Sequence, residues 1–474
     1  MTLHRPLLLA AVFTAGTALH AQALPSAPVP VPTAQSPGTS SRNPSGNTPQ
    51  TGAQSSAPTG GIPNSAGLSG SAAAPIRLQP GQPLTLDMVV SMASTASPRL
   101  LEASSQTQQI RSGVQTARAY TNPSVEVFQG RQYARPITTP GVPGLLQHYA
   151  AYQAIEIPSE RRARIRAAEL SADASRFAQQ GVALTVVAAA KQAFYNSLKR
   201  REEIEHAEEN LKLVDDLRRR VQVQVNVGEV GGLELTRATA EQARAQFAVA
   251  SAQLEYRQSI AVLRAAIAAE PDDPINPQGN MEPRATLAPM NELRDAVLAK
   301  HPALQQSLKD TEAARATLER QKQLRIPQPI AFAEFENQPD LRFWRTGVTV
   351  PLPLWDRRRG PIEEAKATIT RTDAVTRQRR LELTSALERA YEQYQLADQQ
   401  VTSLQAGPLK AAESAVQGAQ AAYRFGERGI VEVLDAQRVL QSVRGDLLDA
   451  QFARQSALVD LEELGAVAPS GARP

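Results

Sequence analysis

The sequence predicts a mainly α-helical protein with a small β part, built from a helix–strand–strand–helix unit that occurs twice. A duplicated turn is the first observation: Gly228–Ala238 returns as Gly426–Ala436, with two glycines, two glutamates and the final alanine in matching places. The second observation is that long runs with apolar residues at steps of three and four precede and follow each copy. Paired glycines suit a tight helix-to-helix reversal that needs positive φ. Each copy is therefore predicted to be the tip of a helical hairpin.

The duplication extends beyond the tips. Matching residues lie roughly 200 positions apart, which is too long a period for a solenoid and indicates one large unit used twice. The matches are Pro98 with Pro302, Asn122-Pro123 with Ile326-Pro327, Val127-Phe128 with Ala331-Phe332, and Ile155–Pro158 with Val348–Pro351.

The N-terminal part is expected to lie outside this repeat. Met1–Ala23 has a basic start, an apolar run and a small-residue exit, which predict a secretory signal peptide cleaved after Ala23. Residues 24–83 are rich in Pro, Ser, Gly and Ala and contain no aromatic residue. Such a segment buries too little apolar surface to offset its ordering entropy, so we expect a disordered linker.

The first repeat is predicted to span residues 84–286. Thr85 suits a helix N-cap, and Pro98 is expected to interrupt the helix that it starts. Two strands with alternating apolar and polar residues should flank the Pro/Gly-rich loop 131–148. The expected elements are a helix at 85–120, strands near 124–130 and 149–157, a helix of roughly 100 Å at 159–227, the tip near 228–232 and a helix at 233–270.

The second repeat is predicted to span residues 287–466 and to follow the same plan, with a disordered tail at 467–474. Breaks are expected at His301-Pro302 and at Gly407-Pro408, because proline lacks the amide hydrogen that a helix interior needs. The expected elements are a helix at 290–325, strands near 330–336 and 343–350, a long helical run at 361–423, the tip near 426–430 and a helix at 430–464.

Four strands are too few to close a barrel in a membrane, where lipid tolerates no open edge. Other copies of the chain must therefore complete the sheet, and three copies would supply twelve strands. In each half two shorter helices can run end to end beside one long helix, which predicts a helical tube. The alternative is a periplasmic coiled-coil spacer without a channel, but a spacer has no use for strand pairs at equal positions in two repeats.

The sequence resembles a known protein family. The duplicated plan, Pro98 and Pro302, the Asn122-Pro123 entry to the first strand and above all Tyr423–Ala436 resemble the TolC-like outer-membrane efflux proteins. Within that family, Val350–Gly360 looks like the strand-to-helix junction of the cobalt-zinc-cadmium (CzcC-like) branch.

The resemblance implies a homotrimer that forms a 12-stranded outer-membrane β-barrel continued by a long α-helical barrel across the periplasm. It implies a passive exit duct for metal ions or small toxic compounds, fed by an inner-membrane pump through a periplasmic adaptor protein. Drug efflux and type I polypeptide secretion are the alternative cargoes. Many relatives carry an acylated N-terminal cysteine, whereas this chain has no cysteine and its barrel must hold it alone.

The same resemblance points to the tips as the adaptor-docking surface. The glycines there would allow close backbone approach by a partner hairpin. We expect replacement of Gly426 or Gly429 by a β-branched residue to abolish export. The docking residues predicted are Gly228, Glu229, Gly231, Gly232, Gly426, Glu427 and Gly429.

Two further candidate sites were weighed against structural alternatives. Glu413, Gln417 and Gln420 share one helix face just inside the second tip and form the candidate lumen gate, although an ordinary helix contact explains the spacing equally well. Basic runs directly follow a strand in each repeat, where they would contact phospholipid headgroups or form an ion-pair rim. These basic residues are Arg161, Arg162, Arg164, Arg357, Arg358 and Arg359.

The sequence offers no support for an enzyme, a cofactor or a metal site. The histidines are scattered without ligand spacing, no phosphate-binding glycine loop is present, and cysteine is absent. His206 lies on a polar helix and is expected to be solvated. Nucleic-acid binding is not expected of an exported chain with a net charge of only +4.

Overall fold

The structure is a computed structural model that describes residues 81–133, 144–281, 284–339 and 341–468. Residues 70–474 form one compact unit. The predicted signal peptide and residues 24–80 of the predicted linker lie outside the described residues, as do 469–474 of the predicted tail. Val467, which we placed in that tail, instead packs against a buried cluster at the end of the last helix.

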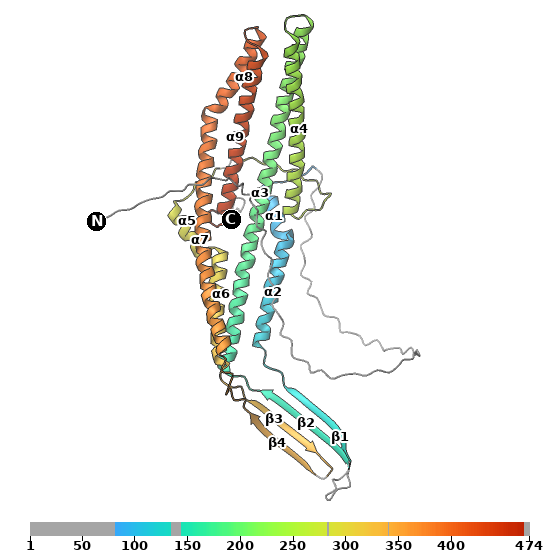
Figure 1. Cartoon of the computed structure of the whole chain (residues 1–474), viewed down its shortest axis with the longest axis vertical. Coiled ribbons are helices and arrows are strands. Elements are labelled where there is room, and N and C mark those ends of the chain that lie inside the picture. Colours follow the sequence, from blue (N-terminus) through green and yellow to red (C-terminus); the bar gives the residue numbers. More distant parts are fainter. Residues whose placement is uncertain (1–80, 134–143, 282–283, 340, 469–474) are drawn as a thin grey trace, which may run out of the picture. The chain divides into compact units, whose positions relative to one another are not determined.

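The described elements follow the duplicated plan (Figure 1). The first repeat contains α1 (Leu86–Ala96), α2 (Pro98–Arg118), β1 (Ser124–Gln132), β2 (Gly144–Ala154), α3 (Pro158–Asn226) and α4 (Gly232–Ala266). The second contains α5 (Met290–Lys300), α6 (Pro302–Gln323), β3 (Ile330–Asn337), β4 (Arg342–Thr349), α7 (Arg359–Ala406), α8 (Pro408–Arg424) and α9 (Ile430–Glu463).

The helix boundaries have local chemical causes. Thr85 is the N-cap of α1, where its hydroxyl oxygen accepts from the amide of Met88 at 3.5 Å. Pro98, Pro302 and Pro408 each occupy the first position of a new helix, so the predicted interruptions are complete breaks. Between α5 and α6, His301 is itself the cap, and its Nδ1 accepts from the amide of Ala303 at 3.2 Å.

One strand prediction was wrong at both ends. We placed the second strand near 149–157, but β2 begins at Gly144 and ends at Ala154. Its early residues pair with the end of β1, with Leu145 opposite Arg131 and Leu146 opposite Gly130. Pairing with a neighbouring strand extends β2 beyond the stretch in which apolar and polar residues alternate.

The four strands form one antiparallel sheet in the order β1-β2-β3-β4. The central pair joins the two repeats, with Tyr149 opposite Phe335 and Tyr152 opposite Phe332. β1 and β4 each have a single partner within the described chain, so both edges of the sheet are open.

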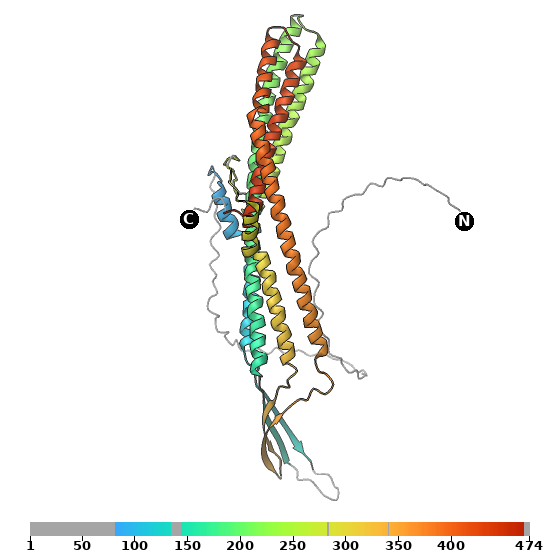
Figure 2. The ribbon, with the colours of Figure 1, turned by 90° about the vertical axis from the view of Figure 1, so that its left-hand side faces the viewer.

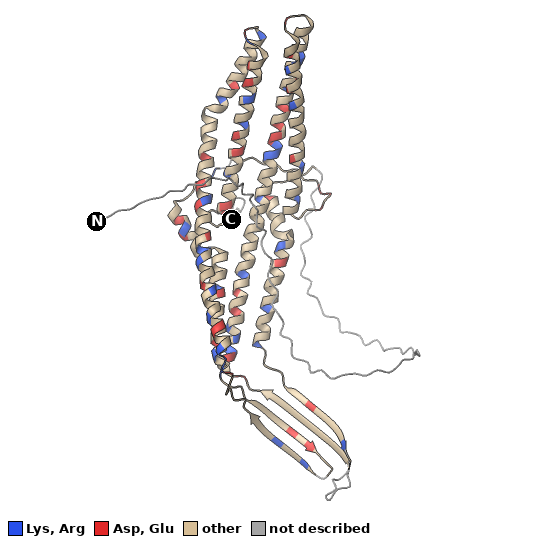
Figure 3. Ribbon diagram, in the orientation of Figure 1, with Lys and Arg blue, Asp and Glu red and all other residues tan. Residues whose placement is uncertain are grey.

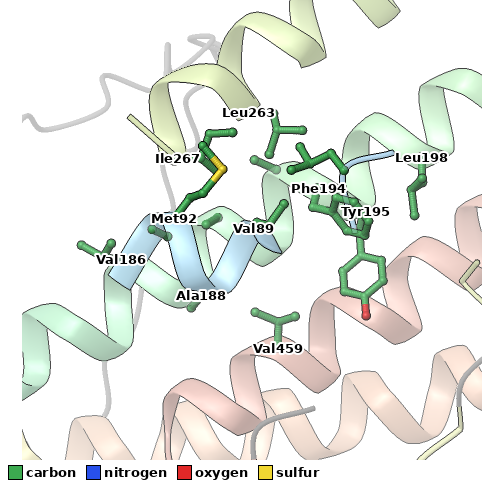
Figure 4. Close-up of a cluster of buried hydrophobic side chains, with 14 of the residues drawn as sticks. Val89, Met92, Val186, Ala188, Phe194, Tyr195, Leu198, Leu263, Ile267 and Val459 are labelled. Atoms are coloured by element: carbon green, nitrogen blue, oxygen red, sulfur yellow. The ribbon is translucent and has the colours of Figure 1, made fainter. Parts of the chain in front are cut away.

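The short helices run along the long ones as the lengths predict. α3 packs against α1 and α2 on the side of the sheet and against α4 toward the tips, while α7 packs against α6 and then α9 (Figures 1 and 2). Contacts of α3 with α6 and α9 tie the repeats together. The largest buried cluster lies where α1, α3, the end of α4 and α9 meet, and it includes Met92, Phe194, Leu263 and Val459 (Figure 4).

Candidate functional site

The two tips have the same backbone hydrogen bonds. At the first, the amide of Gly228 donates to Val225 O at 3.1 Å and that of Glu229 to Gln224 O at 2.9 Å. At the second, the Gly426 and Glu427 amides make the equivalent bonds to Tyr423 O and Ala422 O, at 3.1 and 2.9 Å. This is the Schellman pattern of a helix C-terminus, which requires a residue in the left-handed region. The duplication therefore extends to individual hydrogen bonds.

Only the first glycine of each tip needs positive φ. Gly228 has φ 79° and Gly426 has φ 73°. Gly231 and Gly429 have φ −76° and −81° as the N-caps of the following helices. The expectation that both glycines of each tip serve a reversal with positive φ is therefore wrong for the second one.

Both tips present exposed apolar side chains at equivalent positions. Val227 and Leu233 flank the first turn, and Phe425 and Val431 flank the second. The seven residues predicted as the docking surface are all exposed there: Gly228, Glu229, Gly231, Gly232, Gly426, Glu427 and Gly429. A partner at either tip would meet bare backbone, a carboxylate and two apolar side chains.

Just inside the tips, polar bonds connect the α3/α4 hairpin to the α8/α9 hairpin. Tyr423 donates its hydroxyl to Gln224 Oε1 at 2.5 Å. Burial, and then Glu234, raise the pKa of the Tyr423 phenol, so it keeps the proton that it donates. Further from the tips, Arg438 of α9 pairs with Glu241 of α4 at 3.0 Å, and Arg444 of α9 pairs with Glu209 of α3 at 2.9 Å. Sequence reasoning missed these bonds, because their partners lie in different repeats.

The candidate gate residues of α8 occupy different environments. Glu413 faces Arg444 of α9, with 3.8 Å between Oε1 and Nη2. Gln420 lines a cavity of about 370 Å³ together with Tyr423 and residues of α3. Gln417 is exposed. The ion pair with Arg444 is a helix contact of the kind that the spacing left open as the alternative, and the Glu413 side chain stays 43% exposed beside it.

His206, which we expected to be solvated, is only partly exposed. Its ring is half-buried in a cavity of about 470 Å³ between α3, α4 and α9, and its Nδ1 has no hydrogen-bond partner among the described residues. Burial and then Arg444 lower the pKa of His206, against the opposing effect of three neighbouring glutamates of α3. The imidazole is therefore neutral near pH 7.

Two arginines of the basic run in the first repeat are paired with carboxylates of the same chain. Arg164 pairs with Glu156 at 2.9 Å and with Glu160 at 3.5 Å, and Arg161 lies 3.6 Å from Glu156 and stacks on Tyr120. Burial alone would raise the pKa of Glu156, but hydrogen bonds from Arg164 and Thr121 outweigh it and lower the pKa. These arginines form an ion-pair rim, while Arg162 donates to the carbonyl of Pro158. Figure 3 shows charges of both signs gathered where the helices meet the sheet.

The basic run of the second repeat is different. Arg358 is held by a bond from Nη2 to Gln321 Oε1 at 2.8 Å. Arg357 and Arg359 are exposed and form no ion pair within the described part of the chain. Two repeats with similar sequences at this junction thus differ in whether their arginines are neutralised.

Charged residues buried between the repeats were also missed. Arg454 of α9 interrupts the apolar seam of its helix, which was the available signal; it donates to Met281 O at 3.2 Å and lies 3.4 Å from Asp398. Lys191 of α3 and Glu462 of α9 form a second buried pair at 2.6 Å. Both pairs lie where α9 packs against the rest of the fold.

No group of three or more His, Cys, Asp and Glu residues in the described part of the chain could hold a metal ion. Among the same residues, no helix combines the length and apolar character needed to cross a membrane. The main features of the described chain are the two tips, the hairpin connections behind them, the open sheet and the junction between sheet and helices.

These features define a duplicated α-helical hairpin protein with an open antiparallel sheet, and the family that has this plan matches the sequence. The profile of the outer membrane efflux protein family matches residues 89–269 and 293–466, one copy for each repeat. The chain belongs to this family.

Individual relatives agree with that assignment. The chain is 24% identical over 367 residues to the cobalt-zinc-cadmium resistance protein CzcC of Cupriavidus metallidurans, which covers 76% of this chain and 85% of CzcC. Among solved structures it resembles CusC, described as forming a transmembrane channel, with a TM-score of 0.69 and 19% identity over 80% of this chain and 91% of CusC. It also resembles the CmeC outer membrane channel of Campylobacter jejuni, with a TM-score of 0.71 and 15% identity over 82% and 87% of the two chains.

Proposed function

We propose that this chain is the outer-membrane channel of a tripartite efflux system and that its cargo is metal ions. The observation that carries the proposal is the relationship to CzcC over most of both chains, on a fold whose two hairpin tips and open sheet suit a channel. In this proposal the signal peptide directs export, the sheet lies in the outer membrane and the helices extend into the periplasm.

The two faces of the sheet support a membrane location. Val127, Tyr149, Phe335 and Trp344 are opposite one another in successive strands, lie on one face and are all exposed. Glu334 lies on the other face, where it pairs with Arg345 and accepts from Tyr152 at 3.2 Å. A barrel in lipid requires this arrangement, apolar outward and polar inward.

The open edges support assembly into a homotrimer. β1 and β4 expose unpaired backbone groups, and lipid offers no hydrogen bonds to satisfy them. Two further copies would supply twelve strands and allow the sheet to close.

The outer face of α4 supports the same assembly. Leu233, Ala240, Phe247 and Leu254 follow one another at intervals of seven and are all exposed, as are Ala243 and Ala250 between them. A stripe at this spacing is a coiled-coil seam. The main partner of α4 within the chain, α3, lies on its other side, so a helix of another copy is the occupant that we propose for the seam.

Transport through such a trimer needs no chemistry in this chain. A periplasmic adaptor would dock on the exposed tips, and an inner-membrane pump would supply the energy. Glu413, Gln417 and Gln420 remain our candidate for the constriction near the tips, with a mild preference for cations because only Glu413 is charged. Outer-membrane lipids are the remaining proposed partner.

Two measurements test the proposal. The mass of the detergent-solubilised protein should be that of a trimer, and the trimer should conduct in planar bilayers; a stable monomer would refute the architecture and favour the spacer. The protein should also stay in the outer-membrane fraction after carbonate extraction, although it has no cysteine to acylate.

Deletion of the chain, with the pump and adaptor present, tests the cargo. We expect increased sensitivity to cobalt, zinc and cadmium salts and unchanged sensitivity to lipophilic drugs. The reverse pattern would identify a drug channel. Loss of a secreted polypeptide with neither effect would identify a secretion channel.

A further inference from the structure

The two repeats differ most at the junction from sheet to helix. In the first repeat, β2 ends at Ala154 and α3 begins at Pro158. In the second, β4 ends at Thr349 and α7 begins only at Arg359, although Pro351 matches Pro158 in sequence. We call the additional segment Leu352–Arg358 the junction loop. The first repeat makes the same connection without it, so the fold does not need this loop to link a strand to a helix.

The junction loop exposes large apolar side chains. Leu352 is 67% exposed, Leu354 is 60% exposed and Trp355 is 92% exposed. Three such residues within so short a segment form a patch that needs an explanation, since an isolated exposed apolar residue is ordinary but a contiguous group marks an interaction site.

Hydrogen bonds within the loop, and one bond to α6, fix its backbone. The amide of Leu354 donates to Leu352 O at 2.9 Å, which closes a tight turn at Pro353. Asp356 accepts from the amide of Arg358 at 2.8 Å, and the Arg358 side chain is bonded to Gln321 of α6. Arg358 itself has φ 54°, a left-handed conformation that is unfavourable for a residue with a side chain. The bonds at Arg358 therefore stabilise a backbone conformation that is unfavourable by itself.

The patch continues the apolar face of the sheet. Side chains two apart on a strand lie on the same face, so Trp344 and Val348 of β4 share a face, and Val350 carries it to the loop. All three are exposed. Directly beyond the apolar patch are the basic side chains Arg357 and Arg359, which are exposed and have no carboxylate partner in the described part of the chain.

We propose that the junction loop is a membrane anchor, with Trp355 and the two leucines inserted among the phospholipids of the inner leaflet of the outer membrane and with Arg357 and Arg359 bound to their phosphate groups. Tryptophan favours the boundary between hydrocarbon and headgroups, and arginines beside it attract anionic lipid. The proposal rests on the function proposed above, because it requires the sheet to lie in the membrane. It supplies an interfacial attachment for a chain that has no cysteine to acylate.

The two tryptophans of the chain make a direct test possible. The variant W344F leaves Trp355 as the only tryptophan, and W355F leaves Trp344; excitation at the red edge of the tryptophan absorption band avoids the tyrosines. Each purified full-length protein is reconstituted in vesicles of phosphatidylethanolamine and phosphatidylglycerol, with lipids brominated either near the headgroup end or near the methyl end of the acyl chains. Conductance and trimer mass are measured on the same preparations.

We expect Trp355 to emit at shorter wavelength than in the unfolded protein and to be quenched more by the shallow than by the deep bromolipid. Trp344, on the apolar sheet face, should be quenched by lipid in both positions. The variant L396W in a W344F/W355F background places the tryptophan at an exposed position near the far end of α7 from the sheet, outside the proposed seam of the trimer, and should show no lipid quenching. In R357Q/R359Q, shallow quenching of Trp355 should no longer increase with the content of phosphatidylglycerol.

Two results would overturn the anchor. Trp355 quenched by acrylamide as fully as in the unfolded protein would lie in water. Trp355 shielded from both acrylamide and bromolipid would be covered by another part of the protein, such as a second copy. A preparation that conducts as a trimer and gives either result refutes the anchor alone, whereas a monomer without conductance refutes the proposed function.

Discussion

Replacing Lys191 by methionine should destabilise the protein far more than replacing a surface lysine. Its Nζ lies 2.6 Å from Glu462 Oε2, and the two side chains are only 1% and 6% exposed. The pair joins α3 of the first repeat to α9 of the second. Because K191M removes the buried cation beside a buried carboxylate, the expected cost is about 3–5 kcal/mol of unfolding free energy.

The environment of the pair has a second consequence. Tyr195 is one turn further along α3, and burial followed by the Glu462 charge raises the pKa of its phenol to about 12. A neutral tyrosine carries no positive charge and so cannot replace the missing cation. In the double variant K191M/E462L both charges are gone, and apolar side chains of similar length fill the site, so its stability should return to within about 1 kcal/mol of the parent.

The assay is a double-mutant cycle on the detergent-solubilised protein, unfolded by guanidinium and followed by far-ultraviolet circular dichroism. The matched control is Lys199, which also belongs to α3 and pairs with Asp449 of α9; the Asp449 side chain is 64% exposed, so removal of the lysine leaves a solvated carboxylate and not a buried one. K199M should cost less than about 1 kcal/mol. The reasoning fails if K191M costs no more than K199M, or if K191M and E462L are additive in the double variant.

Three further predictions concern single residues. Gly426→Val places a β-branched residue at φ 73°, so it should lower the free energy of unfolding by about 1–2 kcal/mol and weaken adaptor binding. Gly429→Val, at φ −81°, should have much smaller effects on both. Thermal melting measures the stability, and an adaptor pull-down measures the binding. Burial lowers the pKa of His301, whose neutral Nδ1 caps α6, so the unfolded state binds more protons than the folded state. The stabilisation from this cap is therefore lost as pH falls below about 6.5. His301→Asn should flatten the dependence of the melting temperature on pH, and an unchanged slope would exclude His301 as its source. Tyr394→Phe should cost about 1–3 kcal/mol in the same unfolding assay, because the buried hydroxyl accepts from the amide of Ala285 and donates to its carbonyl, both at 2.8 Å; a cost near zero would mean that water replaces the hydroxyl.

The duplicated plan, the helix breaks and the tips could all be predicted from the amino-acid sequence alone. These features follow from local chemistry that no tertiary contact overrides. Proline has no backbone amide hydrogen to donate within a helix, so new helices begin at Pro98, Pro302 and Pro408. Gly228 and Gly426 tolerate positive φ, so the chain reverses at both.

Which buried charges meet, and which surface charges stay unpaired in the described chain, depends on how the elements pack together. Arg454 is visible in the sequence as a break in an apolar seam, but its partners Asp398 and Met281 O come from other elements. The basic runs after the two strand pairs look alike in sequence, yet Arg164 is neutralised by Glu156 while Arg357 is not neutralised within the described chain. Ion pairing depends on which elements are brought together, and local sequence patterns do not encode that.

The start of β2 and the form of the junction loop have the same kind of cause. β2 begins at Gly144 because β1 offers backbone partners that far, although the apolar alternation of its own sequence begins later. The end of the loop is attached to α6 by the bond from Arg358 to Gln321, a partner from a different helix. Strand ends and loop conformations were decided by long-range pairing, because the backbone groups and side chains that stabilise them belong to distant parts of the chain.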